Sequence, residues 1–191
     1  MPVRRVILAS ASPRRARILE SLGLTFEVRP ADVDESLLPG ESPKAAVRRL
    51  AKAKAVALQR RPDDCVIAAD TLVVLGSRIL GKPKDRAEAR SMLRDLSGRT
   101  HTVTTGVAVA WGRHIVTAID VTEVRFRKME EGEIRDYVRT GEPLDKAGAY
   151  HVEGGGAAFI EAIHGSPSNV AGLSVTTARR LLRRAGVAFR S

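Results

Sequence analysis

The sequence predicts an α/β fold with a mixed β-sheet, and two observations carry this prediction. Short apolar runs and alternating Val, Ile and Thr segments, which are typical of strands, take turns along the chain with segments of helical periodicity. No internal repeat, low-complexity tract or linker-like shift in composition divides the 191 residues. The apolar share of 43% is enough for a core, which must be largely aliphatic because only 4% of the residues are aromatic.

The expected elements follow one another with short connections. Each is bounded by a cap, a glycine or a change in periodicity. In chain order they are strand 6–9, helix 12–22, strand 25–28, acidic loop 32–36, helix 42–58, strand 66–69, hairpin 72–80, helix 85–97, strands 103–109 and 115–126, helix 130–140, glycine-rich loops 141–156 and 165–172, and helix 176–185.

Helix and strand signals are clear in the first half of the chain. Residues 6–9 form an apolar run that is typical of a buried strand. Ser12 is a preferred N-cap residue, Pro13 suits the first helical position, and Gly23 is a common residue just past a helix end. A second Ser-Pro pair, at 42–43, begins the next helix in the same way.

The second half combines a capping box with strands that alternate. Asp85 and Glu88 have the spacing of a capping box, which begins the helix over 85–97. In the later strand, Ile, Thr, Ile and Val alternate over 115–121, but the alternation shifts phase before Val124. A shift of one residue within a long strand predicts a bulge or a sharp bend.

A capped helix that begins with two arginines is the most unusual feature of the N-terminal segment. Helix N-termini carry partial positive charge, so Arg14 and Arg15 are electrostatically unfavourable in the first turn. Backbone N–H groups, the hydroxyls of Ser10 and Ser12, and two guanidinium groups together suit an anion, above all a phosphate. The alternative, which the motif alone leaves equally open, is a surface helix with two solvated arginines.

Asp70 and Lys54 depart most from the apolar pattern around them. Asp70 follows the apolar run 65–69 at the expected carboxyl end of a strand, where open α/β sheets bind ligands, and a turn or cap is its alternative role. Lys54 falls on the apolar stripe of helix 42–58, so it must pair with an anion, face a cavity or extend to solvent. The pattern favours a functional carboxylate for Asp70 and a solvent-directed side chain for Lys54.

Two further segments offer phosphate or metal ligands. Lys82 follows Gly81, where a flexible lysine can reach a phosphate as a point charge. Glu35 lies in the acidic loop, and with Asp70 as a second carboxylate it could hold a hard divalent cation through oxygen. A solvated surface turn is the alternative interpretation of both segments.

The sequence lacks the signatures of several familiar chemistries. It has no Gly-x-x-x-x-Gly-Lys-Ser/Thr phosphate loop and no Gly-x-Ser-x-Gly turn, and its four histidines lack zinc-site spacing. The single cysteine, Cys65, opens an apolar run and is expected in the core rather than as a nucleophile. Asp32 begins a segment that faintly resembles the phosphatase motif of haloacid dehalogenases, although a poor hydrophobic strand precedes it.

The net charge of +10 attracts polyanions such as nucleotides, nucleic acid or anionic membranes. Much of it is arginine on helix exteriors, as in helix 176–185, where four arginines lie opposite an apolar stripe. A solvated face explains this arrangement, and the lack of interleaved aromatic residues argues against a nucleic-acid surface. Because no apolar run suits a signal peptide or a membrane span, we expect a cytoplasmic protein with no membrane partner.

Six segments together resemble the Maf family of nucleoside triphosphate pyrophosphatases. They occur in the family's order across nearly the whole chain, which makes the resemblance far more specific than any one segment. The six are Leu8–Arg15, Ala69–Thr71, Gly81–Pro83, Leu96–His101, Glu142–Tyr150 and Ser168–Leu173. On this resemblance we expect one Maf-like pyrophosphatase domain over residues 1–191.

The resemblance implies a fold, a reaction and a set of site residues. The fold would be like that of inosine triphosphate pyrophosphatases, with helices in two lobes flanking a cleft at a bent mixed sheet. The reaction would convert a nucleoside triphosphate to the monophosphate and pyrophosphate with the aid of Mg²⁺ or Mn²⁺. The family's base position falls on Asp70, which with Glu35 would also bind the metal, and the phosphate positions fall on Ser10, Arg14, Arg15, Lys54 and Lys82.

Three positions bear on which base such an enzyme would accept. The dTTP/UTP branch has Arg, Thr and Gln at these positions, and the 7-methyl-GTP branch has Trp, Gln and Glu. Arg14 and Thr71 match the first branch, whereas Glu153 stands where that branch has Gln. An ionised glutamate can only accept hydrogen bonds, so the base preference could be altered or broadened. We expect dTTP and UTP as substrates, with modified nucleotides as further candidates and a preference for 7-methyl-GTP as the alternative.

Two other functions stay open on the sequence alone. A basic protein could bind nucleic acid or cell-division partners without hydrolysis, and such binding would weaken steeply with salt. A phosphomonoesterase using Asp32 is the second. The sequence does not determine the oligomeric state, and a homodimer is among the states that it leaves open.

Overall fold

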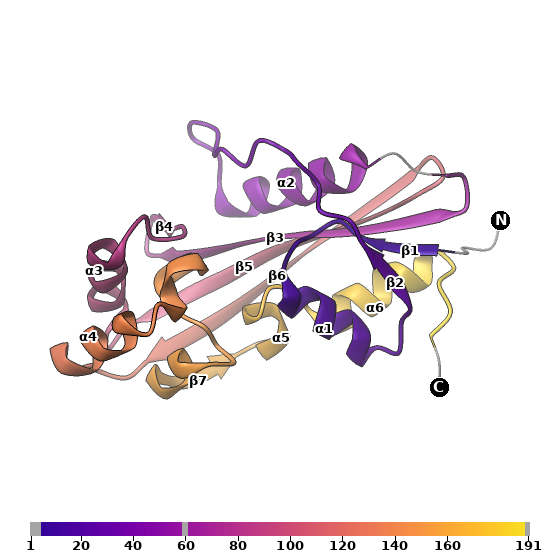
Figure 1. The fold of residues 1–191 in the computed structure, drawn as a ribbon. Helices are drawn as coiled ribbons and strands as arrows, with labels where there is room; N and C mark the ends of the chain where they lie inside the picture. Colours follow the sequence, from indigo (N-terminus) through magenta and orange to yellow (C-terminus); the bar gives the residue numbers. More distant parts are fainter. Residues whose placement is uncertain (1–4, 59–60, 190–191) are drawn as a thin grey trace. The chain divides into compact units, whose positions relative to one another are not determined.

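The computed structural model describes residues 5–58 and 61–189. The strands in this part of the chain are β1 (Arg5–Leu8), β2 (Phe26–Val28), β3 (Asp64–Leu75), β4 (Arg78–Leu80), β5 (Thr100–Trp111), β6 (His114–Phe126) and β7 (Ile160–His164). They form one sheet in the order β2-β1-β3-β5-β6-β7, and β4 pairs with β3 (Figure 1). β1 is parallel to β2 and β3, whereas β4 is antiparallel to β3 and β7 to β6. The sheet is therefore mixed, as expected.

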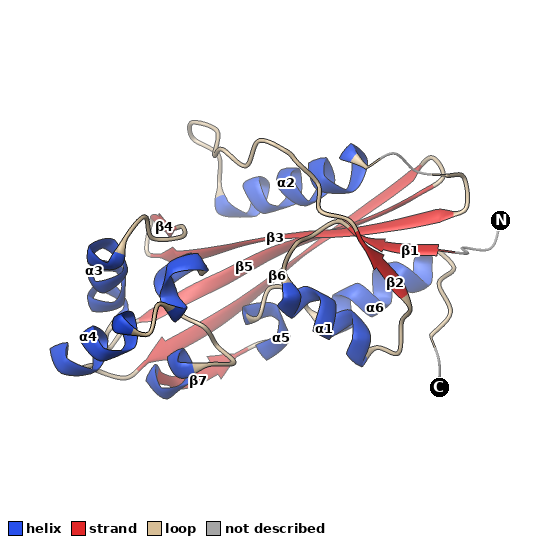
Figure 2. Cartoon of the chain, viewed as in Figure 1, coloured by secondary structure: helices blue, strands red, loops and turns tan. Residues whose placement is uncertain are grey.

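Apart from α5, the α-helices begin and end close to the residues that the sequence indicates (Figure 2). They are α1 (Pro13–Ser21), α2 (Pro43–Ala57), α3 (Arg86–Leu96), α4 (Glu131–Arg139), α5 (Pro167–Val170) and α6 (Val175–Arg184), with 3₁₀ helices at Glu142–Asp145, Ala147–Ala149 and Gly155–Phe159. Ser42 and Asp85 cap α2 and α3 by accepting a backbone N–H with their side chains. Ser12 occupies the N-cap position of α1, but its side chain makes no capping bond within the described residues.

The chain divides into two compact units. The first comprises the residues up to Asp70, then Thr105–Asp120, and the residues from Gly172 onward; the second comprises Thr71–Thr104 and Val121–Ala171. Because β3, β5 and β6 are long strands, each of them contributes residues to both units.

Small residues let α2 lie against the sheet in the first unit. A Cβ at Gly106 in β5 would lie 2.5 Å from the Val47 carbonyl carbon and 2.9 Å from the Arg48 nitrogen, so helix and strand approach closely only because residue 106 is glycine. Alanines and aliphatic residues of β1, α2, β3 and β5 fill the adjoining core. Its buried members are Ile7, Ala9, Ala51, Ala55, Val66, Ala68, Ala108 and Ala110.

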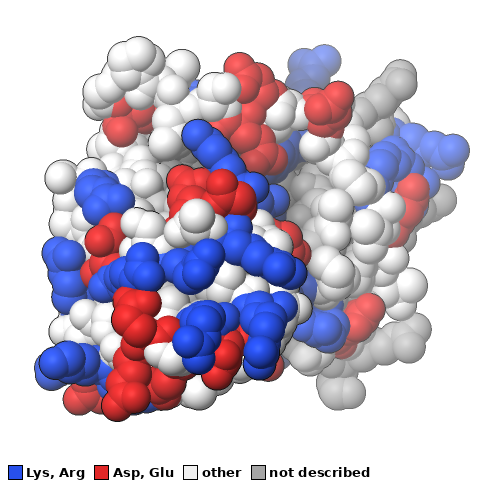
Figure 3. Space-filling model, turned by 60° about the vertical axis from the view of Figure 1, so that its left-hand side comes forward, with Lys and Arg blue, Asp and Glu red and all other residues white. Residues whose placement is uncertain are grey.

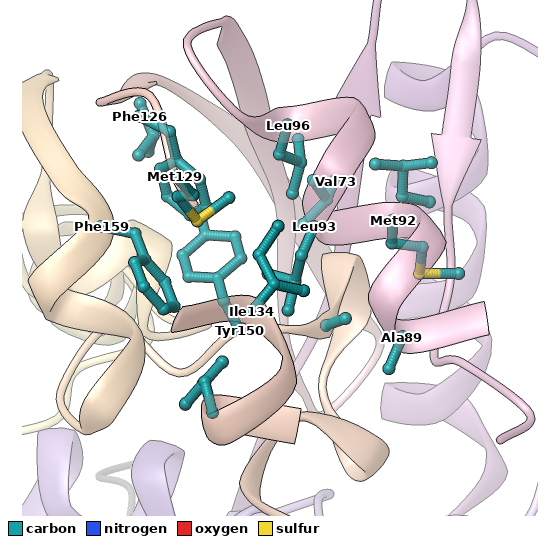
Figure 4. Close-up of a cluster of buried hydrophobic side chains, with 14 of the residues drawn as sticks. Val73, Ala89, Met92, Leu93, Leu96, Phe126, Met129, Ile134, Tyr150 and Phe159 are labelled. Carbon is teal, nitrogen blue, oxygen red and sulfur yellow. The ribbon is translucent and has the colours of Figure 1, made fainter. Parts of the chain in front are cut away.

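A second core, in the second unit, is built under α3 and α4, which lie side by side. Leu93 and Leu96 of α3 and Ile134 of α4 point toward the aromatic residues Phe126 and Tyr150 (Figure 4). Phe126 and Tyr150 meet edge to face with ring centroids 4.8 Å apart. The few aromatic residues of the chain are thus concentrated here, whereas the first core is aliphatic.

Oppositely charged side chains are interspersed over the side that carries α3 and α4 (Figure 3). Arg78 pairs with Asp95 at 2.8 Å and Arg127 with Glu133 at 2.6 Å, both on the surface of the second unit. Exposed pairs of this kind contribute little stability. They do break up the positive charge, so the described residues on this face form no uniform basic patch of the kind that phosphate backbones select.

Two strands differ from the sequence-based prediction. One ends later than expected, and the other has its irregularity at a different residue. β3 does not end at Asp70-Thr71 but continues to Leu75. An ion pair neutralises Asp70, and the buried residues Val73–Leu75 continue the strand. β6 runs unbroken through the predicted slip, and its register against β7 shifts later, between Arg125 and Phe126. The change of phase coincides with the passage of β6 from the first unit to the second at Asp120.

Short elements were missed in the glycine-rich segments. Residues 141–156 hold 3₁₀ turns rather than plain loop, and residues 165–172 hold α5. β7 has no recognisable strand pattern in its sequence. Cys65 is fully buried in β3, which confirms its expected place in the core. Over residues 5–58 and 61–189, no helix has both the length and the apolarity that a membrane crossing demands.

Candidate active site

Helix α2 carries Lys54 at the C-terminal end of its buried stripe. The stripe runs through Val47, Leu50 and Ala51, and Lys54 continues it with only 9% of its side chain exposed. The aliphatic stem lies along the helix-sheet contact, and the ammonium group must find an anion because an unpaired buried charge is costly. The pattern-based preference for a solvent-directed Lys54 is therefore wrong.

Two carboxylates from distant segments meet the Lys54 ammonium. Lys54 Nζ donates a hydrogen bond to Asp70 Oδ1 at 2.6 Å, and Glu35 Oε1 lies 2.8 Å from the same nitrogen. Asp70 comes from the middle of β3 with 8% of its side chain exposed, whereas Glu35 comes from the acidic loop with 61% exposed. The cluster thus has a buried strand carboxylate on one side and a solvent-accessible loop carboxylate on the other.

Burial raises the pKa of the Asp70 carboxyl above its ordinary value of 3.8. The Lys54 ammonium, as a neighbouring charge and as a hydrogen-bond donor, opposes this increase in pKa, and Arg15 opposes it from further away. A carboxylate with a raised pKa is a stronger base than an exposed aspartate, while its ion pair still favours the ionised form. Asp70 is therefore suited to accept a proton.

The loop before α1 is tied together by Arg15. Its Nη1 donates to Ser10 Oγ at 3.2 Å and its Nε donates to the Gly172 carbonyl at 2.9 Å. Ser10 Oγ also accepts the backbone N–H of Ser12 at 3.2 Å. Burial lowers the pKa of the Arg15 guanidinium, and the negative charge of Asp70 opposes that shift. Arg15 thus lies in the electrostatic field of Asp70, and Arg14 precedes it in the first turn of α1.

The carboxylate pair fits a divalent cation as well as an ammonium group. Glu35 and Asp70 direct oxygen atoms toward one point, and hard cations such as Mg²⁺ are bound by one or two carboxylates together with substrate phosphates. Within the described parts of the chain, no group of three or more His, Cys, Asp or Glu side chains could enclose a metal by itself. The donor set therefore suits a cation that is shared with a polyphosphate, not a closed structural site.

Three of the expected site residues belong to the second unit. Thr71 directly follows Asp70 in β3 and is partly buried. Lys82 is exposed in the segment after β4. Glu153 has 45% of its side chain exposed, and its Oε2 lies 3.9 Å from His151 Nε2. The first unit therefore brings together Ser10, Arg15, Glu35, Lys54 and Asp70, and the roles expected of the second-unit residues stay predictions.

Sequence reasoning missed the groups that support these side chains. The Gly172 carbonyl that binds Arg15 carries no side chain and so leaves no signal of its own. His151 Nδ1 lies 3.2 Å from Glu142 Oε1, which also accepts the Gly155 N–H, so Glu153 adjoins a small hydrogen-bonded network. Only the proximity of Glu142 and Glu153 to a histidine in sequence could have suggested this network.

Comparison with known proteins gives the family that the motifs indicate. A family model described as Maf-like protein matches residues 5–185. A dTTP/UTP pyrophosphatase of Anaeromyxobacter dehalogenans is 53% identical over 95% of this chain and 94% of its own. Proteins of the same name from Myxococcus xanthus and Aquifex aeolicus are 50% and 48% identical, over 95% and 94% of this chain and 93% and 94% of theirs.

Solved structures show the same fold at much lower identity. The Ham1 protein of Staphylococcus aureus is 15% identical, with a TM-score of 0.52 over 95% of this chain and 100% of its own. A HAM1 protein from Coxiella burnetii is 17% identical, with a TM-score of 0.52 over 96% and 100%. These likenesses bear out the expected inosine triphosphate pyrophosphatase-like fold. Since the family model spans nearly the whole chain and relatives share about half of its residues, the chain belongs to the Maf family.

Proposed function

We propose that this protein hydrolyses nucleoside triphosphates, dTTP and UTP foremost, to the nucleoside monophosphate and pyrophosphate. The observation that carries the proposal is its 53% identity, over 95% of its length, to a relative named dTTP/UTP pyrophosphatase. The site geometry supports it independently, because a buried carboxylate lies beside cationic groups that suit a polyphosphate. The proposal includes that both units act as one catalytic domain, in the cytoplasm.

Asp70 is the general base of the proposed reaction. As a water oxygen bonds to the α-phosphorus, Asp70 accepts the water proton, and the bond from the α-phosphorus to its bridging oxygen breaks. Pyrophosphate leaves with that bonding electron pair, and the proton on Asp70 later returns to solvent. The raised pKa of Asp70 supports this role, because it brings the base closer to neutral pH.

Cationic groups neutralise the triphosphate in this proposal. Lys54 and Arg15 lie in the field of Asp70, and Arg14 adds a guanidinium at the start of α1. Ser10 orients Arg15 through their hydrogen bond. The proposal also assigns a phosphate-binding role to Lys82, on the resemblance of its Gly-Lys-Pro segment and the reach of a flexible lysine. Charge stabilisation and positioning of this kind supply most of the catalysis in phosphoryl chemistry.

Glu35 and Asp70 are the residues that would hold Mg²⁺ or Mn²⁺. When bound, such an ion supplies charge neutralisation of the phosphate oxygens. The accessible position of Glu35 supports this assignment, since a ligand shared with the substrate must be reachable from solvent.

Base selection is assigned to Arg14, Thr71 and Glu153. Arg14 and Thr71 match the dTTP/UTP branch, while the carboxylate of Glu153 can only accept hydrogen bonds where that branch has an amide. We therefore propose a pyrimidine preference that is broader than in the branch at large.

A nucleotide panel with product identification tests the proposal. The full-length protein is incubated with dTTP, UTP, other nucleoside triphosphates and 7-methyl-GTP, with Mg²⁺ or Mn²⁺, and the released phosphate is identified. Pyrophosphate from dTTP and UTP is expected. Orthophosphate from a nucleoside monophosphate would indicate a phosphomonoesterase, and salt-sensitive duplex binding without hydrolysis would indicate a nucleic-acid-binding protein.

A further inference from the structure

Lys54 is in direct contact with both acidic side chains of the site. We propose that Lys54 is an internal counter-ion, which holds the divalent-cation position between Glu35 and Asp70 and leaves it for the triphosphate when metal and substrate bind together. This inference rests on the proposed function and adds to it a coupling between metal and nucleotide.

The two carboxylates need a cation between them. Asp70 Oδ1 and Glu35 Oε1 lie 2.6 and 2.8 Å from one nitrogen atom, so without positive charge they would repel each other. Asp70 is also nearly buried, where an unneutralised carboxylate is costly. Lys54 meets this need from within the chain.

A metal ion and the ammonium group cannot share this position. A divalent ion would use the same two carboxylate oxygens that now accept from Lys54. A single and a double positive charge a few ångströms apart repel each other strongly in a partly buried site. Metal binding to the protein alone therefore requires Lys54 to withdraw, and this requirement weakens it.

The two cations differ in how they are held, since the flexible stem of Lys54 can take its ammonium group to a new partner, whereas hydrogen bonds fix the guanidinium of Arg15. The Arg15 fork is held by the Gly172 carbonyl and by Ser10 Oγ. Lys54 has a flexible four-carbon stem, and its ammonium group contacts the same two carboxylates that a metal ion would take. A triphosphate offers the ammonium a new anionic partner, so substrate binding lowers the cost of withdrawing it.

A definite coupling follows from these steps. Metal and triphosphate each strengthen the binding of the other, because both are linked to the same movement of Lys54, and the coupling is reciprocal. Removing the Lys54 charge should have opposite effects on the two ligands. It should tighten metal binding to the protein alone and weaken triphosphate binding.

Mn²⁺ binding to the full-length protein, followed by electron paramagnetic resonance, tests this without any turnover. Lys54→Met is expected to bind Mn²⁺ about tenfold or more tightly than the wild type, since one opposing charge is gone. Lys52→Met is the matched control, because Lys52 is an exposed lysine on the same helix, and it should bind Mn²⁺ as the wild type does. Adding Glu35→Gln to Lys54→Met should abolish the gain and so locate it at this pair.

A second measurement begins with the wild-type protein. The α,β-imido analogue of UTP, which resists cleavage at the reacting bond, should tighten Mn²⁺ binding to the wild-type protein by about tenfold or more if a typical coupling applies. In Lys54→Met that enhancement should shrink. Unchanged or weaker Mn²⁺ binding in a folded Lys54→Met, or independent binding of Mn²⁺ and the analogue in the wild type, would overturn the inference. Failure of the wild type to release pyrophosphate would instead overturn the proposed function.

Discussion

At the scale of single residues, Asp70 has both a structural role in the sheet and a role in the proposed chemistry. Its backbone belongs to a 12-residue strand, while its side chain sits in an ion pair that makes burial tolerable. Burial raises the pKa of the Asp70 carboxyl, and the contact with Lys54 opposes this increase. The ion pair favours the ionised carboxylate, and burial makes that carboxylate a better proton acceptor, so substitutions at this residue separate catalysis from folding.

Asp70→Asn should reduce kcat for dTTP and UTP by about 10²- to 10⁴-fold, because an amide cannot act as a general base. The fold should persist, since the amide oxygen keeps the shape of the carboxylate and can still accept from Lys54. Steady-state kinetics and circular dichroism check the two parts. Asp32→Asn is the control, and it should leave pyrophosphate release unchanged. Near-full turnover in Asp70→Asn would remove Asp70 from the mechanism.

The pH dependence of kcat/KM should report the same residue. Activity falls as pH drops through the pKa of Asp70, because the protonated carboxyl cannot accept a proton, and burial places that pKa above 3.8. In Lys54→Met the acid limb should move to higher pH still, since the opposing ammonium is lost. Profiles of kcat/KM for UTP between pH 4 and pH 8 locate the acid limb in the wild type and in Lys54→Met. A limb that moves to lower pH in the variant would contradict this electrostatic account.

Glu153→Gln should narrow the base preference toward dTTP and UTP. The amide regains the ability to donate and accept, so the ratio of kcat/KM for UTP to that for 7-methyl-GTP should rise by about tenfold, the value of one hydrogen bond. The control is Glu161→Gln, at a surface glutamate of β7 that pairs with Arg125. Equal ratios in the wild type and Glu153→Gln would show that Glu153 does not contact the base.

At the scale of elements, what the sequence predicts depends on how local its signal is. The capped helices α2 and α3 begin where their Ser-Pro and capping-box signals place them, because cap and stripe are encoded within a few residues. β7 and the continuation of β3 past Asp70 depend on pairing with distant strands and on the ion pair to α2, which no local pattern contains. The sequence also does not predict the 3₁₀ turns within 141–159, because glycine is equally common in loops and in tight turns.

Gly106→Ala should destabilise the protein by about 1–3 kcal/mol, as overpacking in a tight contact typically does. The added methyl group would meet the α2 backbone at Val47 and Arg48, neither of which is a flexible side-chain tip. Urea unfolding checks this. Gly132→Ala in α4 is the control: its Cβ would meet only the end of Arg135, so stability should hold or rise slightly. A neutral Gly106→Ala would show that α2 can shift on β5 without cost.

At the scale of the whole molecule, the order of six motifs predicts family and fold class, but not which side chains meet. Lys54 and Asp70 are 16 residues apart in sequence, and the apolar pattern alone favoured a solvent-directed lysine. Only the packing of α2 on the sheet brings its stripe to β3 and makes the ion pair necessary. The sequence likewise does not distinguish His101 from its three other histidines, and only the fold shows that His101 is buried in the second core.

His101 should make the stability of the whole protein sensitive to acid. Its ring is 2% exposed, shares a hydrogen bond of 2.9 Å with Tyr150, and lies edge-on to Phe126. Burial lowers its pKa from 6.5 to about 4, so between these pH values the unfolded state binds a proton that the folded state excludes. This contribution to stability is present above pH 6.5 and is lost as pH falls toward 4, by up to about 3 kcal/mol.

Urea unfolding of wild type and His101→Gln between pH 7 and pH 4 measures this contribution. Glutamine does not titrate, so the stability advantage of the wild type over His101→Gln should shrink steadily as pH falls, because only the wild type must exclude the proton. His114→Gln, which replaces an exposed imidazole on β6, separates this effect from any general acid sensitivity. A difference between wild type and His101→Gln that stays constant from pH 7 to pH 4 would mean that the buried imidazole takes up its proton without loss of packing.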